Sequence, residues 1–362
     1  MASKHTQILK KDYPWVTSPL IASAPMRLIA TPTLAIEVSL AGGLGFLGVG
    51  TDITKFSPWL NEASSILQSS PILNASEDVL PIGVGFICWG VDLPTALSIF
   101  SSAPQKPAAA WLFAPKDSKD LVSWTEGIRQ TTDGNTKIWI QVGTVAMALD
   151  IVKSCKPDVL VIQGADAGGH GLAQSSSIIS LLPECADALA TEGFGNIPLI
   201  GAGGIMDGRG VAAALTLGAS GACMGTRFLA TPEAVISQGY KNAVVEARDG
   251  GVATARTTVY DKIRGTIGWP ESYNARGVLN QSFWDNDKGM SDEENERLYE
   301  EEIKKGDAGW GDQGRMTTYA GTGVGLIQKI QPAGGIVREV LKDAKERLAA
   351  TRGLFKGSNV GS

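Results

Sequence analysis

The sequence predicts an α/β protein folded as a closed (β/α)8 barrel, also called a TIM barrel, with an appended C-terminal cap. Between residues 20 and 224, short apolar runs alternate with amphipathic stretches. This alternation is typical of parallel strands joined by right-handed helical crossovers. The apolar runs number eight, the count that closes a parallel sheet into a barrel, and an open doubly wound sheet is the alternative.

Each predicted strand is a short run of mostly apolar residues. Val159 to Ile162, with four large apolar side chains in succession, is typical of a strand buried on both faces of a parallel sheet. The predicted strands are Leu20–Ala24, Gly45–Val49, Pro81–Phe86, Ala109–Phe113, Lys137–Val142, Val159–Gln163, Pro198–Gly201 and Gly221–Met224.

Helices are predicted between the strands, where apolar residues return every three or four positions. Thr231-Pro232-Glu233 indicates the start of another helix, because Thr can cap it and Pro fits its first position. The helices predicted between the strands are Pro32–Ala41, Leu93–Ser101, Lys119–Gln130, Val145–Lys153, Ile178–Thr191 and Gly208–Leu217.

The pattern changes after Ala247, because residues 248–323 lack strong buried-strand runs. This region contains Trp269-Pro270 and Phe283-Trp284, and we expect their Trp and Phe side chains to pack it onto the barrel. Its charged stretch from Ser291 to Lys305 is acidic first and basic last, which predicts a solvated surface helix. The predicted organisation is a barrel over 1–247, a cap or substrate region over 248–323, and a C-terminal segment over 324–362 with a docking helix, Ala333–Ala350.

Composition narrows the class of protein. The 362 residues are 43% hydrophobic and carry a formal charge of −5, which favours a large core and disfavours nucleic acid as a partner. We expect a cytoplasmic protein without a membrane partner, since no secretory signal or transmembrane run is present, and a homo-oligomer is compatible with these features. The scattered cysteines predict reduced core thiols and no metal site: Cys88, Cys155, Cys185 and Cys223.

His170 lies in a glycine-rich turn directly after a predicted strand, in the run Gln163-Gly164-Ala165-Asp166-Ala167-Gly168-Gly169-His170-Gly171. Barrel enzymes place their chemistry at the carboxyl ends of strands, and glycine lets backbone approach a ligand closely. His170 is therefore a candidate acid-base group, and a structural loop histidine is the alternative. The other histidine, His5, lies in a polar N-terminal tail and is a poor candidate.

Two more glycine-rich turns follow the last two predicted strands. They are Gly201-Ala202-Gly203-Gly204-Ile205 and Met224-Gly225-Thr226-Arg227. Barrels often bind a phosphate between the loops after strands seven and eight, where backbone N–H groups face the anion. The two turns together predict such a phosphate site, and Arg227 either adds a charge to it or lies on the surface.

These motifs resemble those of the nitronate monooxygenase family, formerly the 2-nitropropane dioxygenases, which are FMN-dependent TIM barrels. The resemblance rests on Ala24-Pro25-Met26, on the run from Gln163 to Gly171 and on the two later glycine turns. A fifth motif is Tyr319-Ala320-Gly321-Thr322-Gly323-Val324-Gly325-Leu326-Ile327. All five occur in the family's order along nearly the whole chain.

The resemblance implies FMN as the cofactor and His170 as the catalytic group, either a base or the cation that stabilises an anionic nitronate. Pro25 and Met26 would lie against the flavin ring, and the amides of Gln141 and Gln163 would reach the ring edge or the ribityl chain. The other implied cofactor residues include the phosphate-binding turns and are Arg27, Gly85, Gly168, Gly169, Gly201, Ala202, Gly203, Gly204, Met224, Gly225 and Thr226.

The implied reaction oxidises a nitronate or nitroalkane with O2 to a carbonyl compound and nitrite. The protein would position the small-molecule substrate, stabilise its anion and exclude water. Two alternatives stay open. One is an NAD(P)H-dependent flavin reductase of the enoyl-thioester or quinone reductase type, and the other is a non-redox barrel that binds a phosphorylated small molecule.

Several positions depart from the family pattern. Arg27 stands where the family typically has a small residue, and its guanidinium either faces the flavin or an anionic substrate, or forms a salt bridge at the barrel mouth. Asp166 stands where the family often has Glu. Trp89 and Phe86 are candidate pocket residues, with core packing favoured for Phe86. These departures indicate a pocket that need not accept simple nitroalkanes.

Overall fold

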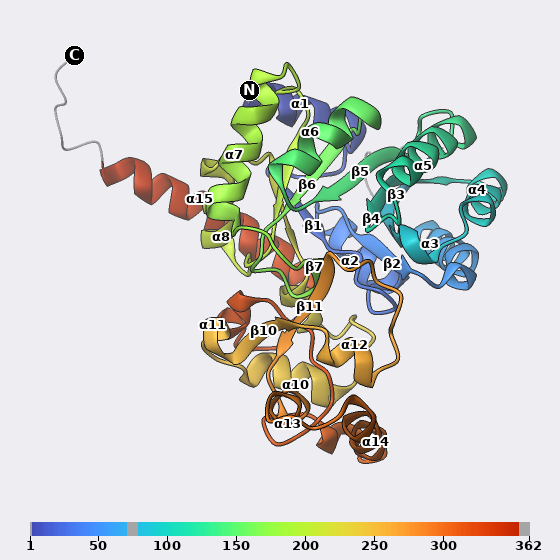
Figure 1. The fold of residues 1–362 in the computed structure, drawn as a ribbon. Helices are drawn as coiled ribbons and strands as arrows, with labels where there is room; N and C mark the ends of the chain where they lie inside the picture. The colour runs from blue at the N-terminus through green and yellow to red at the C-terminus, as the bar shows by residue number, and fades with distance from the viewer. Residues whose placement is uncertain (1, 71–78, 355–362) are drawn as a thin grey trace.

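The computed structural model describes residues 2–70 and 79–354. Its main sheet has eight parallel strands in the order β1-β9-β8-β6-β5-β4-β3-β2. The two edges of this sheet meet, because Ala22 of β1 forms a parallel bridge with Leu44, just before β2. The predicted (β/α)8 barrel is therefore confirmed, and the open doubly wound sheet is excluded (Figure 1).

All eight predicted strands are present, and only their ends differ from the prediction. Strand β3 is the longest, since it extends from Val79 past the predicted end at Phe86. The barrel strands are β1 (Leu20–Ser23), β2 (Phe46–Gly50), β3 (Val79–Ile87), β4 (Lys106–Phe113), β5 (Lys137–Val142), β6 (Val159–Gln163), β8 (Leu199–Ala202) and β9 (Gly221–Met224).

The helices predicted between the strands are also confirmed, and polar side chains cap several of them. Thr144, Ser177 and Asp207 each accept a hydrogen bond from a first-turn amide of the helix that follows. The helices around the barrel are α2 (Pro32–Leu40), α3 (Phe56–Ser69), α4 (Leu93–Ser102), α5 (Ser118–Thr131), α6 (Val145–Ser154), α7 (Ile178–Thr191) and α8 (Gly208–Thr216).

The prediction that a helix starts at Thr231-Pro232-Glu233 is wrong. The chain forms a turn there, in which the Thr231 hydroxyl accepts a hydrogen bond from the Ala234 amide at 3.1 Å. Thr followed by Pro suits a turn as well as a helix start, because Pro presets the backbone for both. The helices of this region are α9 (Thr226–Leu229) and α10 (Gln238–Glu246).

Strand alternation sorts side chains between two cores. In β5, Ile138 and Ile140 face the surrounding helices, whereas Trp139 points into the barrel, where it packs against Phe46 and Trp111. The same alternation directs the next residue on the inner face, Gln141, toward the carboxyl end of the barrel. Alternate residues at the strand ends therefore point into one shared region at the carboxyl end of the barrel.

The N-terminal end of the barrel is covered by α1 (Ala2–Asp12). His5 is only 6% exposed, and its two ring nitrogens lie 3.0 Å from Ser220 Oγ and 2.9 Å from the Gly195 carbonyl oxygen. The prediction of a polar tail is therefore wrong, although His5 has a structural role and lies away from the carboxyl ends of the strands. Deeper in the barrel, Trp139 Nε1 donates a hydrogen bond to the buried Tyr13 hydroxyl at 2.7 Å.

The region after β9 forms a cap over the carboxyl ends of the strands (Figure 1, gold to orange). Two of its strands were not predicted. They pair antiparallel with each other, and the second of them also pairs antiparallel with a further unpredicted strand, which lies inside the predicted glycine turn. Their sequences are short and polar, so no apolar run marks them. The cap sheet combines β10 (Thr254–Thr257) and β11 (Tyr273–Val278) with β7 (Gly169–Leu172), which belongs to the turn after β6. The cap helices are α11 (Gly250–Ala253), α12 (Val259–Ile263), α13 (Gln281–Asp287) and α14 (Asp292–Ile303).

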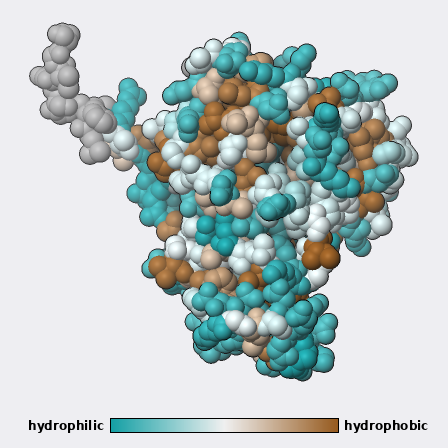
Figure 2. Space-filling view, in the orientation of Figure 1, coloured by the Kyte–Doolittle hydropathy of each residue, from teal (hydrophilic) through white to brown (hydrophobic). Residues whose placement is uncertain are grey.

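Helix α14 is the predicted surface helix, and Figure 2 shows a largely hydrophilic surface where α13 and α14 lie. Of the aromatic residues expected to pack the cap onto the barrel, Trp269 packs at the barrel mouth, whereas Trp284 is 43% exposed. The predicted C-terminal helix is α15 (Ala333–Leu354), which packs against α8 and α2. Residues 355–362 of the predicted C-terminal segment lie outside the described residues.

The four cysteines are free and buried, as predicted. Burial raises the pKa of the Cys88 and Cys185 thiols to about 12, so these side chains stay protonated and pack as small apolar groups. None of the described helices combines the length and the apolar character that crossing a bilayer would require.

We predict that Tyr13→Phe lowers the free energy of unfolding by about 1–3 kcal/mol, because the buried Trp139 N–H loses its acceptor. Urea denaturation followed by tryptophan fluorescence measures this change. A shift below about 0.5 kcal/mol would show that the bond at the base of the barrel contributes little to stability.

Candidate active site

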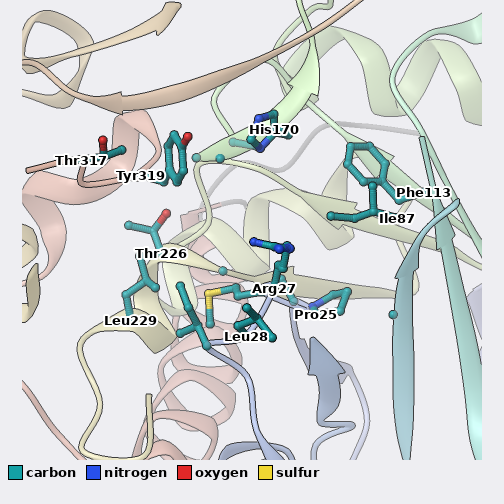
Figure 3. Close-up of a pocket in the computed structure, with 18 of the residues that line it drawn as sticks. Pro25, Arg27, Leu28, Ile87, Phe113, His170, Thr226, Leu229, Thr317 and Tyr319 are labelled. Atoms are coloured by element: carbon teal, nitrogen blue, oxygen red, sulfur yellow. The ribbon is translucent and has the colours of Figure 1, made fainter. Parts of the chain in front are cut away.

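A cavity of about 770 Å³ lies at the carboxyl ends of the barrel strands, beneath the cap. Its barrel side is formed by the ends of strands β3, β4, β5, β6, β8 and β9, together with the loop after β1. Figure 3 shows side chains from the barrel and from the cap facing the same space. A concave site of this size and position is where barrel enzymes bind their ligands.

The cavity brings together most of the predicted site residues. Gly201 and Met224 do not line it, since they alternate with the inward-facing residues Ala202 and Cys223 and face the surrounding helices instead. The predicted residues that line the cavity are Pro25, Met26, Arg27, Gly85, Gln141, Gln163, Gly168, Gly169, His170, Ala202, Gly203, Gly204, Gly225 and Thr226.

Glycine is required at two positions of these turns. Gly203 has a φ of +105°, which L side chains rarely adopt. At Gly168 an added Cβ would lie 2.4 Å from backbone atoms of Ala320 and Gly321, so the turn and the late glycine-rich segment are in direct contact. The Gly321 amide also donates a hydrogen bond to the Thr226 hydroxyl at 3.0 Å. Three of the predicted motifs therefore meet at one side of the cavity.

His170 lies on β7 at the roof of the cavity, with its side chain 14% exposed. Its Nε2 lies 3.0 and 2.9 Å from the two carboxylate oxygens of Asp261, on α12 of the cap. The Trp269 ring stacks on the imidazole, with centroids 3.7 Å apart and planes within 7°. Because a carboxylate only accepts hydrogen bonds, the neutral ring carries its proton on Nε2, and Nδ1 has no partner among the described residues.

Asp261 accepts further hydrogen bonds from the cap. The Tyr319 hydroxyl donates to its Oδ1 at 3.1 Å, and the Thr266 hydroxyl donates to the same oxygen at 2.9 Å. Burial, with a further contribution from the charge of Asp261, raises the pKa of Tyr319 well above its ordinary value, so that this hydroxyl remains a donor. These bonds fix the carboxylate and, through it, the orientation of the imidazole.

Two arginines of the cap sheet fix the backbone before His170. Arg256 Nη2 donates to the carbonyl oxygen of Ala167, and Arg276 Nε donates to that of Ala165, both at 3.2 Å. These arginines are cross-strand neighbours on β10 and β11. Burial, followed by the like charge of Arg276, lowers the pKa of Arg256 to about 10, which still leaves it a cation at neutral pH. The cap therefore holds the predicted catalytic turn from outside the barrel.

Asp261, Trp269, Tyr319 and Thr266 were missed as functional residues by the sequence analysis. Asp261 lies 91 residues after His170, in a cap region without a recognisable motif. Tyr319 stands at the start of the late glycine-rich motif, and Trp269 is one of the aromatic residues that the sequence analysis expected to pack the cap onto the barrel. These two signals pointed to the right segments, but neither indicated contact with the histidine.

The positions of Arg27 and Arg227 bear on the alternatives that the sequence left open for each of them. Arg27 lines the cavity, and its Nε donates to the Thr51 hydroxyl at 2.9 Å. It has no ion pair with any described residue, so the salt bridge proposed for the barrel mouth is absent from this part of the chain. Arg227 does not line the cavity and is 8% exposed, so it is buried beside the predicted phosphate turn and is not a surface residue.

The remaining candidate residues divide between pocket and scaffold. Trp89 lines the cavity, and its ring meets Trp269 with centroids 5.5 Å apart. Phe86 also borders the cavity, but it packs mainly in a core aromatic group with Phe56 and Trp124, as favoured. Asp166 lies outside the lining and accepts a hydrogen bond from the Thr322 hydroxyl at 3.0 Å. Its role is to attach the late glycine-rich segment to the catalytic turn.

The donor set fits a flavin. Gln141 Oε1 accepts a hydrogen bond from Trp111 Nε1 at 3.0 Å, which leaves the Gln141 amide N–H groups to face a ligand. Gln163 Nε2 donates to the His170 carbonyl oxygen at 3.2 Å. Apolar walls, neutral amides and glycine backbone suit a flat heteroaromatic ring with a phosphate tail. The described residues contain no cluster of three or more His, Cys, Asp or Glu that could hold a metal ion.

Comparison with known proteins agrees with this site. A family model described as nitronate monooxygenase matches residues 123–343. The chain is 47% identical over 348 residues to "Nitronate monooxygenase npaC" of Metarhizium robertsii, covering 95% of this chain and 96% of that protein. It is 39% identical over 359 residues to a nitronate monooxygenase of Neurospora crassa, covering 94% and 93%. The solved structure of FabK from Thermotoga maritima is similar, with a TM-score of 0.70, 25% identity and coverage of 96% and 98%.

A barrel with a glycine-lined cavity at its carboxyl end, and these similarities, define an oxidoreductase of the flavin-dependent barrel class. The chain belongs to the nitronate monooxygenase family. It is thus a monooxygenase and a flavoprotein, in a family whose enzymes act on small nitronates with oxygen. The predicted resemblance to this family is confirmed.

We predict that Gly168→Ala lowers the free energy of unfolding by about 1–3 kcal/mol and weakens flavin retention, because the new Cβ overlaps the backbone of residues 320 and 321. Urea denaturation and the flavin absorbance remaining after gel filtration measure the two effects. Gly251→Ala is the control, since an added Cβ there meets nothing within 4 Å. Equal behaviour of the two variants would contradict the tight contact at Gly168.

Proposed function

We propose that this protein is an FMN-dependent nitronate monooxygenase that oxidises alkyl nitronates and nitroalkanes with O2 to a carbonyl compound and nitrite. The observation that carries this proposal is the His170–Asp261 pair, 2.9 Å apart, above a cavity with glycine turns and neutral amides. A positioned base beside a flavin site is what removal of an acidic α-proton requires. Family membership supports the same reaction.

The proposed flavin site uses residues from every side of the barrel mouth. The backbone at Gly203, Gly204, Gly225 and Thr226 would hold the phosphate, in the position that barrels commonly use. Pro25, Met26, Arg27 and Gly85 would lie along the ring, and Gly168 and Gly169 would let backbone approach it. Ala202, Gln141 and Gln163 complete this set. The bound flavin would supply the electron acceptor for the nitronate.

His170 is proposed to act through Nδ1. With Nε2–H held by Asp261, the unpaired Nδ1 can accept the α-proton of a nitroalkane. The resulting imidazolium then lies beside the anionic nitronate and stabilises it. The Trp269 ring covers one face of the imidazole and keeps water from it. A preformed nitronate needs no such proton transfer, so it depends on His170 only for charge stabilisation.

Each region of the chain is assigned a separate role in this proposal. We propose that residues 1–247 bind the cofactor, that residues 248–323 orient the catalytic histidine and contact the substrate, and that the C-terminal segment, 324–362, docks back on the barrel through α15. Asp261, Trp269 and Tyr319 support the cap assignment, because each contacts His170 or its partner.

We predict that His170→Asn retains flavin but lowers the turnover of neutral nitroalkanes on the order of a hundredfold, the scale of a lost general base. Turnover of the preformed nitronate should fall much less. Oxygen consumption and nitrite release measure both rates. Unchanged nitroalkane turnover would contradict the assigned role of His170.

The wild-type protein distinguishes this function from the alternatives. Anaerobic mixing with a nitronate should reduce the bound flavin, whereas NADH should leave its visible spectrum unchanged. Rapid bleaching by NADH would support a flavin reductase instead. A purified protein that stays colourless after addition of FMN would support the non-redox barrel.

We predict that Asp261→Asn lowers nitroalkane turnover on the order of tenfold or more, since an amide no longer fixes the proton of the imidazole on Nε2. The ratio of nitroalkane to nitronate turnover measures this effect. Thr266→Val is the control, because it removes a hydrogen bond to Asp261 but leaves the contact with His170 intact. Equal ratios in wild type and Asp261→Asn would show that Asp261 has only a structural role.

A further inference from the structure

Arg227 is a buried cation without an ion pair among the residues that the structure describes. It follows Thr226 on α9 and is 8% exposed. Its Nη1 is buried and has no hydrogen-bond partner in that part of the chain. Buried arginines in proteins are nearly always paired, because taking an unpaired charge out of water is costly. Arg227 therefore lacks a compensating negative charge.

The single turn of α9 has two faces. Thr226 and Leu229, three residues apart, both line the cavity, and Figure 3 shows them beside the pocket. Phe228 belongs to the core between the barrel and its helices, and Arg227 is outside the cavity lining. Arg227 thus lies behind the turn Gly225-Thr226, on the side away from the proposed phosphate, and does not contact a ligand of the cavity.

Two carboxylates act on Arg227 through their charge, and both have other partners. Asp207, the N-cap of α8, accepts a hydrogen bond from Arg209 Nε at 2.9 Å. Glu339, on α15, is exposed and accepts one from Gln331 Nε2 at 2.8 Å. Burial lowers the pKa of Arg227, and the charges of Glu339 and Asp207 oppose this effect. These two carboxylates therefore compensate the guanidinium only in part.

The position of Arg227 relates it to both glycine turns of the proposed phosphate site. In sequence it directly follows Gly225-Thr226. The charge of Asp207 acts on it, and Asp207 stands three residues after Gly204, at the end of the other turn. Charges interact more strongly through the protein interior than through water. A cation behind these turns can therefore act on an anion held between them.

A third carboxylate, Asp166, lies beside the phosphate turns, since a Cβ added at Gly204 would be 3.1 Å from the Asp166 Cβ. The charges of Arg256 and Arg276 act on Asp166 from the cap sheet. Asp166 thus has cations of its own, as Asp207 has Arg209. This leaves Arg227 as a cation whose charge a bound phosphate can balance.

We propose that Arg227 is an electrostatic positioning residue for the flavin phosphate, which it stabilises as a dianion across the turn Gly225-Thr226 without touching it. This inference rests on the proposed function, because it takes the cofactor to be FMN with its phosphate between the two glycine turns. The phosphate and the guanidinium then each supply the charge that the other lacks. In this way the site distinguishes FMN from riboflavin, which has the same ring system and no phosphate.

The first test measures binding of FMN and of riboflavin to the full-length protein after its flavin has been removed, by quenching of flavin fluorescence. Wild type should bind FMN more tightly than riboflavin. Arg227→Met keeps much of the side-chain length without the charge, and it should lower this preference about tenfold or more. Arg227→Lys keeps the charge and should retain most of the preference.

A second measurement follows the charge of the phosphate itself. In phosphorus NMR of the holoenzyme, the signal of the bound phosphate moves as the dianion takes up a proton, which for a phosphate monoester happens at about pH 6. A cation behind the turn favours the dianion, so the titration of Arg227→Met should lie about one pH unit above that of wild type. A purely structural change would weaken the binding of both flavins and leave this titration unchanged.

Lys241→Met is the matched control. Lys241 is also a cation with 8% exposure outside the cavity lining, but its Nζ donates a hydrogen bond to the Pro232 carbonyl oxygen at 3.2 Å. This variant should keep the wild-type preference for FMN. An unchanged preference or an unchanged phosphate titration in Arg227→Met would overturn the proposal. Equal losses in Arg227→Lys and Arg227→Met would overturn it as well, since the charge would then not matter.

The same measurements separate this inference from the proposed function. A wild type that prefers FMN, together with an unchanged preference in Arg227→Met, would contradict the role of Arg227 alone. Equal binding of FMN and riboflavin to wild type would contradict both, because the phosphate site itself would be absent. A preference that depends on Arg227, in a protein that does not oxidise nitronates, would support this inference and contradict the proposed reaction.

Discussion

The contact between His170 and Asp261 is the interaction on which the rest of the site depends. The histidine follows a barrel strand, and the carboxylate belongs to the cap, so one pair of hydrogen bonds joins the two layers at the cavity. Tyr319 and Thr266 donate hydrogen bonds to the same carboxylate and hold it in place. This matters because a mobile carboxylate could not keep the imidazole in one orientation. The stacked Trp269 ring limits the remaining rotation.

The cap serves the barrel through backbone contacts as well. Strand β7 pairs with β11 of the cap, and Arg256 and Arg276 bind the carbonyl groups just before it. On the other side, Gly168 packs directly on residues 320 and 321. A short glycine-rich turn would have little order by itself, since it buries few side chains. The cap sheet and the late glycine-rich segment supply that order through these contacts.

Much of the barrel side of the site could be predicted because it is local in sequence. A glycine turn after a buried strand identifies a strand end, and all barrel strand ends meet at one face. The same reasoning did not anticipate that Gly201 and Met224 lie outside the cavity lining, because strand alternation turns each of them outward although its neighbour lines the cavity. The prediction for His5 failed because α1 is mostly polar and buries only one face, so its composition resembles that of an unstructured polar tail. Asp261 could not be predicted at all, since its function depends on a contact across 91 residues.

The sequence by itself determined the barrel, its eight strands and the family, and it singled out His170 as the candidate catalytic residue, because strand periodicity, glycine turns and motif order are properties of short segments. Only the tertiary structure decided the partner of that residue and the exclusion of Arg227 from the cavity lining. Both depend on which segments meet after the chain has folded. In a barrel with a cap, the segments that meet at the site are far apart in sequence, as His170 and Asp261 are.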